Sequence, residues 1–379
     1  MSADDPLSWS AGLLVVAWLV ILTRGVRAVA EDAVGDAPAA WPDIVAIVPA
    51  RDEAAVIARS VGSLLAQDYP GRLRVILIDD HSSDGTSEIA RALAPSARSE
   101  HLPPAPALTV LPAPALTPGW TGKLAAVAHG IAHAGEPAWL WLTDADIAHS
   151  PETLRALVAM AARDRLVLNS RMALLRTASF AERAIVPAFV YFFRLLYPFT
   201  SVNDPRSGTA AAAGGCMLVD RAALARAGGI AAMRGALIDD VTMGKLMKRH
   251  GPIHLALSHA TVSLRASDWH GLWTMIARSA YAQLRFSPWL LGGAVMGILL
   301  LFWGPLVVTI AVGWRGVGAL LLMLLSFAPM LRFYRQSPLW TLALPMIALF
   351  YAAATLASAV QHWRGKGGMW KGRAQAMAT

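Results

Sequence analysis

Apolar residues are distributed along this chain in two different ways. Within residues 42–265 they form short runs and spaced patterns separated by polar loops, and on both sides of that stretch they form long, nearly uncharged runs. Short runs between turns are typical of a soluble α/β domain, whereas long uninterrupted runs are typical of membrane-spanning helices. The pattern therefore predicts a soluble domain at 42–265 that is flanked by membrane segments.

The terminal apolar runs predict a multi-pass membrane protein. Residues 7–23 are apolar and have acidic residues before them, so we interpret them as an anchor and not as a cleaved signal peptide. Arg24 and Arg27 follow this run, and the positive-inside rule places them and the soluble domain in the cytoplasm. Residues 288–362 are apolar enough for two or three further spans. Two spans would keep the basic tail at 363–379 in the cytoplasm, whereas three would place it on the opposite side, so the count stays open.

Strands and helices alternate within the soluble domain. The β-branched run 44–48 predicts a buried strand, residues 53–67 have helical spacing, and 73–78 predicts a second strand. A further helix is predicted at 124–134. This alternation predicts a Rossmann-like, mostly parallel sheet, which binds ligands beyond the carboxyl ends of its strands.

Acidic residues follow three predicted strands, the two above and a third at the apolar run 138–142. A turn or a helix cap accounts for any one of them, but their recurrence collects negative charge in one crevice, which is costly without compensating cations or donors. The Asp-x-Asp spacing of the last pair suits a divalent cation that bridges to a nucleotide diphosphate. The three pairs are Asp52 and Glu53, Asp79 and Asp80, and Asp144 and Asp146.

Two further segments carry candidate chemistry. Lys123 follows a glycine-containing turn at the start of a predicted helix, where backbone amides and a positive charge suit a phosphate, although a solvated lysine in a turn is the alternative. The segment is not a Walker A loop, because the Gly-Lys-Ser/Thr ending is absent. Asp239 and Asp240 begin another predicted helix, where one caps the helix and the other is free to act as a base.

Composition agrees with a mixed protein. The 379 residues are 56% hydrophobic, and the mean hydropathy of +0.47 is too high for an ordinary soluble protein. The net charge of +8 comes from dispersed Lys and Arg that also flank the membrane segments, so anionic lipid and not nucleic acid is the expected partner. Cys216 is the only cysteine, which excludes an intrachain disulfide and fits a reducing compartment.

In their order, these motifs resemble the family-two glycosyltransferases with a GT-A fold, and most of all the membrane-bound hopene-associated glycosyltransferases. The resemblance implies an inverting, hexosyltransferase-type enzyme of the bacterial inner membrane. It would transfer a sugar from a nucleotide sugar, a UDP-sugar, to a lipid hydroxyl of hopanoid or polyprenyl type. The matching segments are 45–53, 78–86, 122–123, 143–146, 214–217 and 239–240.

The resemblance also implies a role for each matching residue. Asp240 takes the place of the catalytic base, so that one displacement inverts the anomeric carbon, and Asp239 is assigned to substrate binding. Asp144 and Asp146 would hold Mg²⁺ or Mn²⁺, with Asp146 the more direct ligand. Asp80 would accept a hydrogen bond from uracil, Lys123 would lie by the base or the diphosphate, and the nucleoside pocket would be lined by Pro49, Arg51 and Glu53.

One segment departs from the family pattern. Membrane members often carry Gln-x-x-Arg-Trp on an amphipathic helix before the last spans, but here Ala282 fills the Gln position ahead of Arg285-Phe286. We predict an amphipathic interfacial helix at 266–287, on which Arg278, Gln283 and Arg285 either meet the diphosphate or simply snorkel to the bilayer surface.

Three other functions are compatible with parts of the sequence. A processive polysaccharide synthase is weakened by the imperfect helix motif. A non-catalytic scaffold that retains the fold is disfavoured because Asp146 and Asp240 are both present. A transporter is disfavoured because the C-terminal spans are almost uncharged. The sequence names no protein partner.

Overall fold

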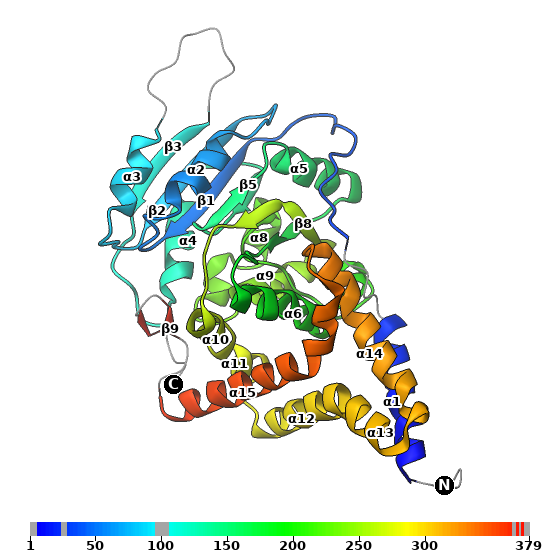
Figure 1. Cartoon of the computed structure of the whole chain (residues 1–379). Helices are drawn as coiled ribbons and strands as arrows, with labels where there is room; N and C mark the ends of the chain where they lie inside the picture. Colours follow the sequence, from blue (N-terminus) through cyan, green and yellow to red (C-terminus); the bar gives the residue numbers. More distant parts are fainter. Residues whose placement is uncertain (1–5, 24–28, 95–105, 366–368, 371–372, 375–379) are drawn as a thin grey trace. The chain divides into compact units, whose positions relative to one another are not determined.

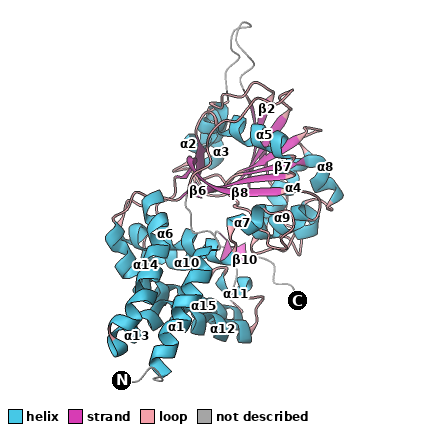
Figure 2. Cartoon of the chain, turned by 90° about the vertical axis from the view of Figure 1, so that its right-hand side faces the viewer, coloured by secondary structure: helices cyan, strands magenta, loops and turns pink. Residues whose placement is uncertain are grey.

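The structure is a computed structural model, and it describes residues 6–23, 29–94, 106–365, 369–370 and 373–374. The chain divides into two compact units, which Figure 1 and Figure 2 show from two sides. The sheet unit contains Ala30–Arg176, Ser201–Ala266 and Gly368–Thr379. The helical unit contains Met1–Val29, Thr177–Thr200 and Ser267–Gly367.

The sheet unit is built on a mixed, mostly parallel sheet, as predicted. Its strand order is β3-β2-β1-β4-β7-β6-β8-β5. The first four strands are parallel to one another, and only β7 and β5 run against the common direction. The strands are β1 (Ile44–Ala50), β2 (Leu73–Asp79), β3 (Ala107–Pro112), β4 (Trp139–Leu142), β5 (Ile147–His149), β6 (Leu168–Leu174), β7 (Met217–Asp220) and β8 (Ile253–Ser263). The short strands β9 (Met369–Trp370) and β10 (Arg373–Ala374) pair only with each other.

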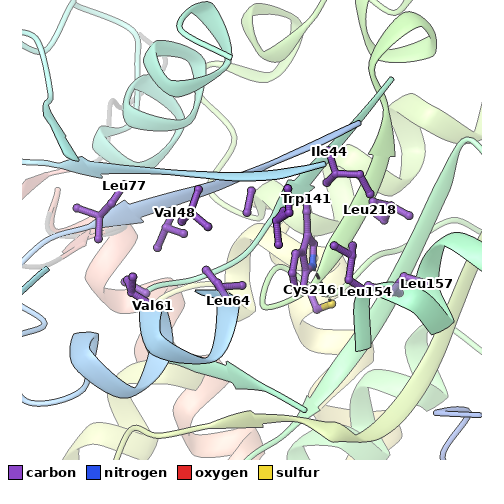
Figure 3. Packing of buried hydrophobic residues seen from close by; sticks show 14 of the residues in the cluster. Ile44, Val48, Val61, Leu64, Leu77, Trp141, Leu154, Leu157, Cys216 and Leu218 are labelled. Carbon is purple, nitrogen blue, oxygen red and sulfur yellow. Dashed lines mark hydrogen bonds between the residues drawn. The ribbon is translucent and has the colours of Figure 1, made fainter. Parts of the chain in front are cut away.

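Helices cover both faces of this sheet because successive side chains of each buried strand are apolar. On one face, Val48 of β1 and Leu77 of β2 belong to the same buried cluster as Val61 and Leu64 of α2 (Figure 3). The helices and short turns of this region are α2 (Ile57–Leu65), α3 (Thr86–Ala92), α4 (Gly122–Ala132), α5 (Thr153–Asp164), α7 (Phe199–Asn203), α8 (Arg221–Arg226), η1 (Ile230–Met233) and α9 (Asp239–Lys248).

The opposite face receives α4, the helix that begins next to Lys123. Gly130 of α4 lies so close to the sheet that a Cβ atom there would be 2.4 Å from Ile78 Cδ1 and 2.8 Å from Ile47 Cγ2. A larger residue would push the helix outward. This close contact fixes α4, and therefore Lys123, relative to β1 and β2.

The predicted helix 53–67 is shorter in the structure than the sequence pattern indicated. It begins at Ile57, because the residues before it form a turn in which the Val56 N–H donates to the Glu53 carbonyl (2.9 Å). The Glu53 N–H donates to Thr86 Oγ1 (2.8 Å), and the Ala54 N–H donates to Asp84 Oδ2 (2.9 Å). The prediction of a helix start at Glu53 was therefore wrong, and these residues form a turn after β1 that is tied to the turn after β2.

The chain enters the sheet unit along β8. The Glu31 N–H donates to the Leu257 carbonyl (3.0 Å). The Asp32 carboxylate accepts hydrogen bonds from Ser258 Oγ (2.6 Å) and from the His259 N–H (2.7 Å). These bonds attach the segment that follows the N-terminal helix to the last long strand.

The helical unit contains the apolar segments. Three of its helical segments are long and apolar enough to cross a membrane, Pro288–Val312, Trp314–Phe333 and Pro338–Trp363, and a shorter apolar helix lies at the N-terminus. Trp18 of that N-terminal helix donates to the Leu301 carbonyl (3.2 Å). The elements are α1 (Pro6–Thr23), α6 (Phe180–Leu196), α10 (Trp269–Ala277), α11 (Ala280–Gln283), α12 (Pro288–Ile298), η2 (Leu299–Trp303), α13 (Gly304–Val312), α14 (Trp314–Phe333), η3 (Pro338–Ala343) and α15 (Leu344–Trp363).

Two predictions about this unit need comment. The segment 266–287, expected as one amphipathic helix, forms the two short helices α10 and α11. Its end is sharply turned, because Arg285 and Phe286 both have left-handed backbone angles (φ 52° and 55°). Arg24 and Arg27 lie outside the described residues. Of the basic tail, the structure describes only residues 363–365, 369–370 and 373–374.

Candidate active site

The carboxyl ends of β1, β2 and β4 lie at one edge of the sheet, since the three strands are adjacent and parallel. The acidic residues that follow them are thereby brought to the same edge, as the sequence predicted. They do not form a single cluster, however. The structure divides them into turn-forming residues and three groups that contain cations.

Two of the acids hold turns. Asp79 accepts hydrogen bonds from Ser87 Oγ (2.8 Å) and from both the amide and the hydroxyl of Ser82. Asp52 has a left-handed backbone (φ 49°), and its carboxylate accepts from the Ser83 N–H (2.9 Å). For Asp79 the turn that was the alternative in the sequence accounts for these contacts, and Asp52 in addition lies 3.8 Å from Arg51 Nε.

Arg51 and Asp80 form the first group that contains a cation. Arg51 Nη1 donates to the Asp80 carbonyl (2.5 Å) and lies 3.7 Å from Asp80 Oδ2. The Asp80 N–H donates to the carbonyl of Ala50, the last residue of β1 (2.8 Å). These bonds hold both side chains at the ends of β1 and β2, where the nucleoside pocket was predicted.

Lys123 forms the second group, with Asp144 and Asp239. Its Nζ lies 2.7 Å from Asp144 Oδ1 and 2.9 Å from Asp239 Oδ2. Burial alone would lower the pKa of Lys123, but the two carboxylates raise it well above its ordinary value, so the side chain stays charged. The lysine therefore joins the Asp-x-Asp segment to the start of α9.

Asp240 lies beside this group. Its carboxylate accepts hydrogen bonds from the Val241 N–H (2.7 Å) and, more weakly, from the Gly214 N–H (3.4 Å). Burial and repulsion from Asp239 raise its pKa to about 6, against the opposing effect of Lys123 and the two amides. A carboxylate with such a pKa is deprotonated at neutral pH and is a stronger proton acceptor than an ordinary aspartate.

Gly214 is the point where these residues meet. A Cβ atom at this position would lie 3.4 Å from Lys123 Nζ, 3.6 Å from Asp240 Cβ and 3.7 Å from Asp144 Oδ2. The absence of a side chain thus leaves open the space between the candidate base and the Asp-x-Asp segment.

A cavity opens at the same place. It is lined by four of the predicted site residues, Pro49, Lys123, Asp144 and Asp239, together with apolar side chains of α4, β7, η1 and α9. The apolar part of the lining includes Met217, Ile230, Met233 and Met243. The cavity extends from the end of β1 to the start of α9.

The third group contains a residue that the sequence analysis missed. Arg265 follows β8, and its Nε lies 3.0 Å from Asp146 Oδ2 while its Nη2 lies 2.6 Å from Glu53 Oε1. Ser263 Oγ also donates to Asp146 Oδ2 (3.2 Å). The only sequence signal for Arg265 was a basic residue at the end of the predicted soluble domain, which is too common to single it out.

A second residue that the sequence analysis missed, His149, contacts the start of the Asp-x-Asp turn at Thr143. Its Nε2 lies 2.9 Å from Thr143 Oγ1, and its ring lies 4.6 Å from that of Trp141. Burial lowers the pKa of His149 to about 3, so the imidazole is neutral and structural. Trp141 in turn donates to Cys216 Sγ (3.4 Å), a contact visible in Figure 3.

The remaining predicted residues belong to the helical unit. Arg278 ends α10, Gln283 ends α11, and Arg285 follows in the left-handed turn. Gln283 Oε1 accepts a hydrogen bond from Tyr197 Oη (2.6 Å). A role for these three residues toward a diphosphate stays a prediction.

The comparison with protein families identifies the fold and the chemistry. The sequence profile of glycosyltransferase-like family 2 matches residues 42–282, which is well over half of the chain. The chain belongs to this family. It is therefore a glycosyltransferase, and the mostly parallel sheet is its GT-A fold.

One solved structure agrees with this fold over nearly its whole length, and a second is similar over part of the chain. The mannosyltransferase PcManGT from Pyrobaculum calidifontis, solved with GDP-Man and Mn²⁺, is 22% identical over 95% of this chain and 99% of that one, with a TM-score of 0.55. Glucosyl-3-phosphoglycerate synthase from Mycobacterium tuberculosis is 17% identical over 64% of this chain and 79% of that one, with a TM-score of 0.41. No curated protein matches the sequence of this glycosyltransferase.

The acidic residues fit one kind of divalent cation site. Among the residues that the structure describes, no group of three or more His, Cys, Asp or Glu side chains is arranged to hold a metal. Mg²⁺ is commonly bound by one or two carboxylates together with substrate phosphates, and two carboxylates are what Asp144 and Asp146 supply. The donor set therefore fits a cation that binds with a diphosphate, not one held by protein alone.

Substitution of Gly214 by Val is expected to reduce sugar transfer by the glycosyltransferase at least about tenfold, because the branched side chain would enter the space between Asp240 and Asp144. Gly214→Ala is the matched control. Its Cβ would meet its neighbours at ordinary contact distances, and we expect less than about a threefold loss. Initial rates with a radiolabelled donor measure both variants. Equal rates for Gly214→Val and Gly214→Ala would show that the reaction does not need the space beside Gly214.

Proposed function

We propose that the protein is an inverting glycosyltransferase that moves a sugar from a UDP-sugar to the hydroxyl of a membrane lipid of hopanoid or polyprenyl type. The observation that carries this proposal is the position of Asp240. A carboxylate with a raised pKa lies next to Gly214, which also adjoins Asp144 of the Asp-x-Asp segment. Attack by a hydroxyl on an anomeric carbon needs such a base on one side and a stabilised leaving diphosphate on the other.

The residues of the site divide the work as follows. Asp240 accepts the proton of the attacking hydroxyl, and Lys123 holds Asp144 and Asp239 in place while keeping the pKa of Asp240 from rising further. Asp144 and Asp146 would hold Mg²⁺ or Mn²⁺, which when bound neutralises charge on the leaving diphosphate. A single displacement by one base, without a glycosyl-enzyme intermediate, inverts the anomeric configuration.

The nucleoside end of the donor is assigned to Pro49, Arg51, Glu53 and Asp80. Arg51 and Asp80 support this assignment because their mutual contacts fix both side chains at the ends of β1 and β2. The family resemblance gives Asp80 to a uracil ring, so UDP is the first donor to test. GDP is the second, since PcManGT was solved with GDP-Man.

The lipid acceptor and the location rest on the apolar helices. Three segments long and apolar enough to cross a membrane follow the family-matched region directly. An enzyme anchored in this way meets lipid hydroxyls at the bilayer surface. We propose the cytoplasmic face of a bacterial inner membrane, where nucleotide sugars are available and Arg24 and Arg27 satisfy the positive-inside rule.

The proposal is tested by UDP binding to the detergent-purified protein, measured by calorimetry with Mn²⁺ and with EDTA. We expect binding with Mn²⁺ and at least about tenfold weaker binding in EDTA, since a cation held by Asp144 and Asp146 would neutralise charge on the diphosphate. Asp146→Ala should lose the Mn²⁺ effect. Asp68→Ala, which removes a carboxylate paired with Arg155 on the surface, should retain it.

The outcomes of this experiment are distinct. Binding of GDP in place of UDP would change the donor but keep the reaction. Binding of neither nucleotide, with or without Mn²⁺, would contradict the proposed donor site. Metal-dependent binding without transfer to any extracted lipid would contradict the proposed acceptor and favour a soluble one.

A further inference from the structure

Arg265 forms ion pairs with both Glu53 and Asp146. The two carboxylates are mostly shielded, with side chains 11% and 14% exposed, whereas the arginine side chain is 45% exposed. Two shielded anions from different strand ends thus share one arginine that reaches them from solvent. This arrangement is stable without a ligand, because each carboxylate has a charge-assisted hydrogen bond.

The same arrangement conflicts with a metal at Asp146. Arg265 Nε and Ser263 Oγ both donate to Asp146 Oδ2, so a divalent cation at this oxygen would face the guanidinium at close range. Arginine does not lose its charge at any accessible pH. The repulsion is therefore relieved only when the guanidinium moves away from Asp146.

An anion offers the guanidinium a new partner. Arg265 remains held by Glu53 (2.6 Å) when it leaves Asp146, so it stays at the rim of the site. Guanidinium groups bind phosphate oxygens through paired hydrogen bonds, as they bind carboxylates. A nucleotide diphosphate that arrives with the cation supplies those oxygens.

We propose that Arg265 is a positioning residue that competes with the divalent cation for Asp146 and then binds the donor diphosphate, so that cation and nucleotide bind tightly only together. This inference rests on the proposed nucleotide-sugar site. It adds to that site a residue outside the Asp-x-Asp segment that makes metal binding depend on the donor. Arg265 lies two residues before Ser267, where the chain enters the helical unit.

The test measures Mn²⁺ binding to the EDTA-stripped, detergent-purified full chain by the electron paramagnetic resonance signal of free Mn²⁺, with and without saturating UDP or GDP. In the wild type we expect weak binding of Mn²⁺ alone and much tighter binding with the nucleotide. Arg265→Gln should bind Mn²⁺ alone at least about tenfold more tightly than the wild type does. The factor by which the nucleotide increases the affinity for Mn²⁺ should be at least about tenfold smaller in Arg265→Gln than in the wild type, a change within the usual range of coupling between sites.

Two controls separate this effect from a general loss of structure. Arg155→Gln also removes an arginine from an ion pair, with Asp68 (2.5 Å), and should leave Mn²⁺ binding unchanged. Arg265→Lys keeps the charge but not the bridging geometry, so its affinity for Mn²⁺ alone should stay within about threefold of the wild type. A merely destabilised protein would bind Mn²⁺ more weakly, not more tightly.

The results decide between the two levels of the argument. If the wild type binds Mn²⁺ and nucleotide together but Arg265→Gln binds Mn²⁺ alone no more tightly than the wild type, the inference is overturned and the proposed function stands. If the wild type binds neither nucleotide with Mn²⁺, the proposed function and the inference both fail. If Arg265→Gln does not fold, Arg265→Lys provides the test. A rise of at least about tenfold in the affinity of Arg265→Lys for Mn²⁺ alone, which is the rise expected for Arg265→Gln, would overturn the role of the charge.

Discussion

Replacement of Asp240 by Asn is expected to slow sugar transfer by at least about a hundredfold, the usual scale for loss of a general base. The amide has the same shape and retains an oxygen that can accept the hydrogen bond from the Val241 N–H. It cannot accept the proton of the attacking hydroxyl. Binding of nucleotide with Mn²⁺ should therefore be unchanged, and only the rate of turnover should fall.

The control for this variant is Asp220→Asn. Asp220 also begins a helix, where its carboxylate accepts from the Ala223 N–H (2.5 Å), and Asn caps helices about equally well. Asp220→Asn should turn over at the wild-type rate.

The wild type should also depend on pH in a defined way. Its kcat/KM should fall as the pH is lowered through about 6, where Asp240 becomes protonated. Asp240→Asn with normal turnover would exclude Asp240 as the base.

Replacement of Lys123 by Met is expected to have the second largest effect, because it leaves three carboxylates close together without their cation. Lys123 lowers the pKa of Asp240, so its removal raises that pKa above about 6. The base then becomes protonated at a higher pH, and the acid limb of the kcat/KM profile should move upward by at least about one pH unit. Nucleotide binding should weaken at least about tenfold as Asp144 and Asp239 lose their shared partner.

A pH profile from 5 to 9 with saturating donor, combined with calorimetry, measures both effects. Lys245→Met on the exposed side of α9 is the control, since it removes the same charge from the helix that Asp239 begins without touching the carboxylates that Lys123 joins. An acid limb that stays near pH 6 in Lys123→Met would contradict the electrostatic role of Lys123. It would leave Lys123 with a role in binding alone.

Much of the fold followed from local patterns. The runs at 44–48 and 73–78 predicted β1 and β2 because a buried parallel strand is apolar on both faces, and both strands formed within two residues of the prediction. The three long apolar segments after Pro288 were visible for a similar reason, because a span needs about 20 residues in one uninterrupted run.

The local pattern failed where a turn precedes the helix. The helix expected from Glu53 begins only at Ile57, because the Val56 N–H donates to the Glu53 carbonyl in a turn (2.9 Å). Thr86 Oγ1 and Asp84 Oδ2 hold this turn by accepting hydrogen bonds from the first two amides of the segment. The helix expected at 266–287 is interrupted between Ala277 and Ala280. Apolar spacing indicates which face of a segment is buried, but it does not show where the hydrogen bonds of that segment are made.

The sequence by itself determined the alternation of strands and helices in the first part of the sheet domain, the acids at the strand ends and the family, since each depends on short segments of the chain. Only the tertiary structure decided which cation each acid contacts. It showed that Lys123 joins Asp144 to Asp239, and that Arg265 reaches Glu53 from 212 positions away in the sequence. An ion pair depends on distance in space, and the distance between such remote residues is fixed only when the sheet brings its strand ends together.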